Sequence, residues 1–155
     1  MGMGIGDVRS PGEDLAGRVS PVGRDALDAL FATGQWLHAR QRYNDASAVF
    51  RVIVLCAPDE ERGYLALGAC HEGLGQDAIA LEIYGMAVLT LPAPRCHVAR
   101  ARVLWRAGKA DDAEEALDEA EGIAEAEDDD DLRALVRTHR ACAGAMSAGA
   151  GMRTL

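Results

Sequence analysis

A period of 34 residues in the positions of small, aromatic and proline residues constrains this chain more than any other feature of its sequence. The residues that recur at this distance are Gly34 and Gly68, Ala46 and Ala80, Phe50 and Tyr84, and Pro58 and Pro92. A further copy follows at 33 residues, and its matches are Gly75 with Gly108, Ala80 with Ala113, Tyr84 with Leu117, and Ala87 with Ala120. Repeated matches at one distance indicate a repeated structural unit. We therefore expect three similar units stacked in a row.

Each unit has the pattern of a helix hairpin, because apolar residues recur at three and four positions and no segment from residue 24 onward alternates as a strand does. We expect a small residue in the first helix to face a small residue in the second, and large residues to fill the space between hairpins. These positions are Gly34, Gly68 and Ala101 in the first helices, Ala46, Ala80 and Ala113 in the second helices, and Phe50, Tyr84 and Leu117 between hairpins.

A helix hairpin with this period resembles the tetratricopeptide repeat. The predicted fold is all-α, with three tetratricopeptide-like hairpins in a short right-handed solenoid and a C-terminal capping helix. The predicted helices span residues 24–40, 44–57, 60–73, 77–91, 94–107, 110–125 and about 129–146. The predicted organisation is a flexible arm at 1–22, a repeat domain at 23–147 with repeats at about 27–60, 61–93 and 94–127, and a flexible tail at 148–155.

Charge and cysteine usage narrow the functional classes. The chain has 155 residues, a net charge of −9 and a single lysine, Lys109, so we expect no nucleic-acid partner. It shows no secretory signal, no apolar run that could span or insert into a membrane, and no CxxC pair, which favours a cytoplasmic protein with reduced thiols. The acid concentrates between Asp111 and Asp131, where we expect a solvated helix face, with partner steering as the alternative.

Two Cys-His pairs are the candidates for chemistry, Cys70-His71 and Cys96-His97. Neighbouring residues on a helix point about 100° apart, so neither pair converges on one zinc ion, and we expect no metal and no cofactor. A thiol enzyme that uses Cys70 with His38 or His71 stays open as an alternative. No Gly-rich phosphate loop or oxyanion loop accompanies the thiol, so we predict a protein that is not an enzyme and has no catalytic residues.

Three features resemble the class II chaperones of bacterial type III secretion systems, which hold pore-forming translocator subunits before export. They are LALGACHEGLGQ at residues 65–76, the pattern of Tyr84, Gly85 and Ala87, and the start of the third repeat at Pro94-Arg95. The resemblance covers about residues 27–125. It implies a cytoplasmic bacterial protein whose concave groove takes an extended translocator segment with spaced apolar and proline anchors, and it admits a homodimer.

The resemblance also implies which residues line the groove. Gln35, His38 and Met86 stand where the family usually has aromatic residues, so we expect wider and more polar pockets. The alternative reading is a tetratricopeptide adaptor or needle-subunit chaperone with a different protein partner, which could be a transcriptional regulator. The predicted groove residues are Phe31, Gln35, His38, Leu65, Ala69, Met86, Val98, Arg102 and Trp105.

Overall fold

The computed structural model describes the backbone of residues 22–150 and the side chains of residues 22–145. Within these residues the chain forms seven helices and no strands. The amino-terminal arm predicted at 1–22 lies almost wholly outside the described residues, and so do residues 151–155 of the predicted tail. The helices are α1 (Arg24–Ala39), α2 (Tyr43–Cys56), α3 (Glu61–Gly73), α4 (Asp77–Thr90), α5 (Pro94–Arg106), α6 (Ala110–Ala126) and α7 (Asp130–Ala150).

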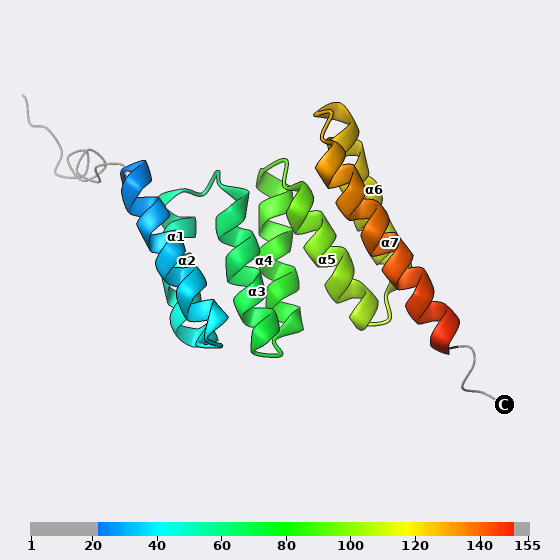
Figure 1. Ribbon diagram of the computed structural model, residues 1–155, viewed down its shortest axis with the longest axis horizontal. Coiled ribbons are helices and arrows are strands. Elements are labelled where there is room, and N and C mark those ends of the chain that lie inside the picture. Colours follow the sequence, from blue (N-terminus) through cyan, green and yellow to red (C-terminus); the bar gives the residue numbers. More distant parts are fainter. Residues whose placement is uncertain (1–21, 151–155) are drawn as a thin grey trace, which may run out of the picture.

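The helices form three hairpins, α1–α2, α3–α4 and α5–α6, which stand side by side in chain order (Figure 1). Each hairpin also packs on the next through α2 with α3 and through α4 with α5. The last helix, α7, packs against both α6 and α5 and covers the end of the row. The prediction of an all-α fold with three tetratricopeptide-like hairpins and a capping helix is therefore confirmed.

Prolines, and glycines with a positive φ, mark the helix boundaries. Pro58 and Pro92 follow the ends of α2 and α4, and Pro94 begins α5, where its missing N–H is not needed. The turns inside the second and third hairpins place Gly75 and Gly108 at φ of 70° and 75°, which only glycine adopts without strain. Six of the helices accordingly end within one residue of the predicted positions.

The seventh helix is longer than predicted, because it continues to Ala150 instead of ending near residue 146. The flexible tail had been predicted to begin at residue 148. Its alanines are strong helix formers, however, and one glycine inside a helix costs only about 1 kcal/mol relative to alanine.

The glycines of the first helices face aromatic rings and not small residues. A Cβ atom on Gly34 would lie 2.6 Å from the Phe50 ring, and one on Gly68 would overlap the Tyr84 ring. The expectation that the alanines of the second helices face these glycines was therefore wrong, because the ring of the same hairpin lies over each glycine. Ala46 and Ala80 are fully buried beside the rings, as a close helix crossing requires.

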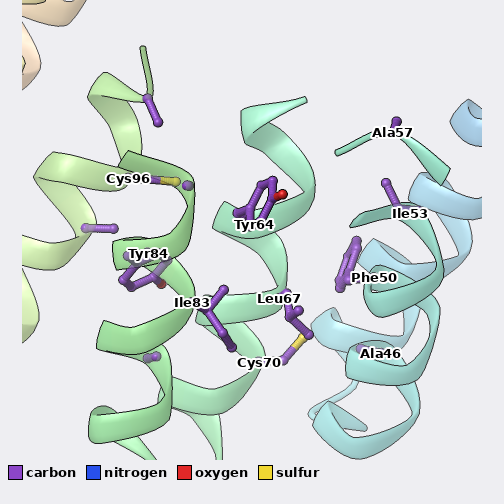
Figure 2. Packing of buried hydrophobic residues seen from close by; sticks show 14 of the residues in the cluster. Ala46, Phe50, Ile53, Ala57, Tyr64, Leu67, Cys70, Ile83, Tyr84 and Cys96 are labelled. Atoms are coloured by element: carbon purple, nitrogen blue, oxygen red, sulfur yellow. The ribbon is translucent and has the colours of Figure 1, made fainter. Parts of the chain in front are cut away.

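Two clusters of buried side chains form the core. The first runs from α1 to α5 and includes Phe50, Leu67, Cys70 and Tyr84 (Figure 2). The second joins α5, α6 and α7 around residues such as Leu117. Among the helices of residues 22–150, none is long and apolar enough to cross a lipid bilayer.

The Glu61 carboxylate of the second hairpin caps the N-terminus of α5, the first helix of the third hairpin. Helix α5 has no capping side chain at its own N-cap, Ala93. Instead Glu61, the first residue of α3, accepts the backbone N–H of Cys96 through Oε1 at 2.7 Å. Burial raises the pKa of Glu61, although this hydrogen bond opposes the shift. The capping bond fixes the position of α5 relative to α3.

Candidate functional site

A pocket of about 260 Å³ opens between the first helices of the first two hairpins. Gln35 and His38 of α1 line one side, and Ala66 and Ala69 of α3 line the other. The Phe50 ring of α2, which is 1% exposed, closes the bottom. The pocket thus has an apolar floor with an amide and an imidazole at its rim, an arrangement that can bury an apolar anchor and hydrogen-bond the backbone beside it.

Phe31 and Leu65 flank this pocket one helical turn before Gln35 and Ala69. The Phe31 ring meets the Phe50 ring edge to face, with 5.4 Å between centroids. Phe31 and Leu65 are both partly buried against the first core cluster. Five of the predicted groove residues, Phe31, Gln35, His38, Leu65 and Ala69, therefore lie on the facing surfaces of α1 and α3.

Arg102 and Trp105 of α5 lie further along the row. The Arg102 guanidinium donates to Oε1 of Glu72 at 2.7 Å, so an ion pair with α3 holds its side chain. Trp105 is partly buried and packs against the second core cluster. Arg102 also lies near His139 of α7, and burial together with this guanidinium lowers the pKa of His139. The capping helix α7 thus lies close to Arg102.

Met86 and Val98 do not join the pocket that Gln35 and Ala69 form. Met86 belongs to α4, the second helix of its hairpin, and is half exposed. Val98 is only 3% exposed and packs with Ala101 and Leu104 in the second core cluster. Its side chain therefore supports α5 against α6 and α7.

The sequence interpretation missed Phe50 and Ala66 as lining residues. Phe50 was assigned to the core from its place in the repeat, and it does serve there, but the ring also reaches the pocket because Gly34 leaves room for it. Ala66 follows Leu65 directly, and its small side chain gave no signal. The 34-residue match between Gly34 and Gly68 was the one pattern that could have placed a ring at this depth.

Glu72 connects three side chains at the inner side of the second and third hairpins. Its Oε1 accepts from the Tyr84 hydroxyl at 2.6 Å as well as from Arg102, and its Oε2 accepts from Arg106 at 2.9 Å. Burial alone would raise the pKa of Glu72, but the donors Arg102, Tyr84 and Arg106 outweigh it and lower that pKa. Glu72 therefore stays ionised and ties α3 to both α4 and α5.

The cysteine that first suggested chemistry is part of the core. Cys70 is fully buried, and burial raises the pKa of its thiol to about 11. The thiol is thus protonated at neutral pH, which argues against a nucleophile. The neighbouring His71 places Nδ1 2.7 Å from Gln76 Oε1. Among the described residues no cluster of three His, Cys, Asp or Glu side chains could hold a metal ion.

No family model matches the chain. Low calcium response locus protein H of Yersinia pestis is 27% identical over 100 residues, which are 64% of this chain and 60% of that protein. The structure of PcrH in complex with the chaperone binding region of PopB matches with a TM-score of 0.66 and 29% identity over 83% of this chain and 99% of that one. The chain is similar to the type III secretion translocator chaperones.

Two further structures extend the likeness to these chaperones. PcrH from Pseudomonas aeruginosa superposes with a TM-score of 0.70 and 26% identity over 84% of this chain and 98% of that one. The translocator chaperone SycD of Yersinia enterocolitica has the same fold, with a TM-score of 0.70 and 24% identity over 84% of this chain and 95% of that one. The chain spans about three fifths of the length of the curated relatives that it matches.

Proposed function

We propose that this chain is a type III secretion chaperone that holds an extended segment of a translocator subunit in the groove along α1 and α3. The observation that carries the proposal is the pocket between Gln35, His38 and Ala69, whose walls come from α1 and α3 and whose apolar floor is the Phe50 ring of α2. A relative with the same fold has been solved with the chaperone binding regions of PopB and of PopD. The chain acts as a cytoplasmic binding protein and not as an enzyme.

The pocket also indicates which cargo residue it takes. Phe50, Ala66 and Ala69 provide an apolar surface, and the volume of about 260 Å³ accommodates one aliphatic or proline side chain. Gln35 and His38 can hydrogen-bond the extended backbone on either side of that anchor. Cargo binding therefore masks one apolar segment of the translocator before export. The proposal admits a homodimer, since SycD has been solved as an alternative dimer.

Filling the pocket tests this proposal. Ala69→Glu places a carboxylate against Phe50 and Ala66, and a bound apolar anchor would then have to desolvate that charge. Co-expression with a translocator from the same genome, followed by affinity purification, should recover at least about tenfold less translocator with this variant, a loss of about 1.4 kcal/mol. Helix content and melting temperature, measured by circular dichroism, report whether the variant folds.

The matched control is Ala78→Glu, which makes the same substitution on the exposed surface of α4. It should recover as much translocator as the parent chain. Equal recovery with both variants would contradict the assignment of the groove. If no translocator copurifies with the parent chain, and a needle subunit or a regulator does, the adaptor alternative replaces this proposal.

A further inference from the structure

A second and larger hollow, of about 460 Å³, lies between α4, α5 and α6. His97 and Arg100 of α5 line it, and both precede Arg102 by a spacing that puts them on a different side of the helix. Leu89 of α4 borders the hollow and is 86% exposed. This pocket is thus separate from the groove between α1 and α3, and nothing in the proposed function uses it.

Three carboxylates of α6 give the pocket its charge. Asp112, Glu115 and Glu119 line it, and in the described part of the chain none of them forms an ion pair. Three other acidic residues of the same helix are different, because Glu114, Asp118 and Glu121 all pair with Arg140 of α7. One row of carboxylates on α6 is therefore paired with Arg140. The other row faces the pocket and has no ion-pair partner among the described residues. With Arg100 included, the pocket carries an excess of negative charge.

His97 provides an independent sign of a ligand. Its side chain is only 9% exposed, and its Nδ1 atom is buried without a hydrogen-bond partner among the described residues. Buried polar atoms are nearly always paired, so an exception in a pocket wall calls for an explanation. Burial lowers the pKa of His97, against the opposing effect of Glu119, so the ring is uncharged at neutral pH. An uncharged imidazole keeps one nitrogen as an acceptor.

We propose that this pocket binds the arginine side chain of a protein segment that also packs an aliphatic residue on Leu89. A guanidinium offers five donors in a fixed plane, so it can serve Glu115 or Glu119 bidentately and still direct an N–H toward the imidazole. The unpaired Nδ1 of His97 is itself buried, so this hydrogen bond requires the ring to rotate toward the pocket. Its apolar stem lies against Val88 and Ala116. An ammonium group presents a point charge without this planar geometry, so lysine fits the site less well.

Titration with short peptides, followed by nuclear magnetic resonance of the full chain, tests the proposal. The probe is acetyl-leucyl-arginine amide, and the matched control is acetyl-leucyl-citrulline amide, which has the same shape without the charge. We expect saturable shifts of the His97 imidazole and of the α6 amides with the arginine peptide, and at least about tenfold weaker binding of the citrulline peptide. Acetyl-arginine amide lacks the leucine and so makes no apolar contact with Leu89. It should therefore bind several times more weakly than the dipeptide.

Charge-neutralising variants locate the site. Glu115→Gln combined with Glu119→Gln should weaken binding of the arginine peptide at least about tenfold, whereas Asp118→Asn, in the row that pairs with Arg140, should not weaken it. The proposal is overturned by equal binding of the citrulline peptide, by an equal loss with Asp118→Asn, or by shifts that gather at Gln35 and His38 instead. Absence of saturable shifts at His97 overturns it as well. If acetyl-arginine amide binds as tightly as the dipeptide, the site takes a free cation and not a segment.

Discussion

Replacing Gly68 by alanine should lower the free energy of unfolding by about 3 kcal/mol, the largest stability effect that we expect from one added methyl group in this chain. The added Cβ would overlap the ring of Tyr84, which is fully buried and cannot move aside. The clash falls on the contact between α3 and α4 at the centre of the row. Chemical denaturation followed by circular dichroism measures the loss.

The physical cause predicts which second change restores stability. Tyr84→Leu removes the ring, so the cost of Gly68→Ala should be much smaller in that background, whereas Tyr84→Phe keeps the ring and should not relieve it. The control is Gly85→Ala, also inside a helix, where a new Cβ meets nothing within 4 Å. That variant should gain about 0.5–1 kcal/mol, because alanine suits a helix better than glycine. Equal effects at Gly68 and Gly85 would contradict the packing described here.

Removing the carboxylate of Glu72 should cost about 2–3 kcal/mol, the second large effect. Glu72→Ala deprives the buried Tyr84 hydroxyl of its acceptor and releases Arg102 and Arg106 from α3. Both arginines are partly exposed, so water recovers some of their interaction, and most of the cost falls on Tyr84. Glu82→Ala on exposed α4 is the control and should change stability by less than about 0.5 kcal/mol. A comparable loss at both positions would argue against the network.

The Glu72 carboxylate also predicts how the free energy of unfolding changes with pH. The pKa of Glu72 is lower in the folded chain than its ordinary value of 4.5, because the donors from Arg102, Tyr84 and Arg106 outweigh burial. Its contribution is therefore present above pH 4.5 and is lost as the pH falls through the folded pKa. The stability difference between the parent chain and Glu72→Gln should shrink accordingly between pH 6 and the lowest pH at which the chain stays folded. A difference that grows on acidification would contradict this sign.

The fold was predictable because its signals are local and repeated. Proline and glycine end the helices, and the 34-residue match between Phe50 and Tyr84 places the hairpins in register. The choice of Gln35, His38 and Ala69 as groove residues came from the resemblance to the chaperone family, and all three line the pocket between α1 and α3. This reasoning fails where a side chain depends on a third helix. Val98 is buried in a cluster that α5, α6 and α7 build together, and no periodicity within α5 reveals it.

The Glu72 network and the pocket at His97 were not predictable for a related reason. Their members come from two or three helices, and each residue taken singly is an ordinary charge on a helix. From the sequence alone, the acidic stretch of α6 was interpreted as one solvated helix face. Its division into a row paired with Arg140 and a row facing a pocket depends on where α4, α5 and α7 pack around α6.

Site-specific photo-crosslinking tests the central claim most directly. A photoreactive phenylalanine analogue replaces Gln35 at the rim of the groove pocket or, as the matched control, Leu55, which is 77% exposed on α2. Each variant is co-expressed with a translocator, irradiated and analysed by mass spectrometry. The groove assignment predicts a crosslink from position 35 to one short apolar segment of the translocator and none from position 55. A crosslink from position 55 alone, with none from position 35, would contradict it.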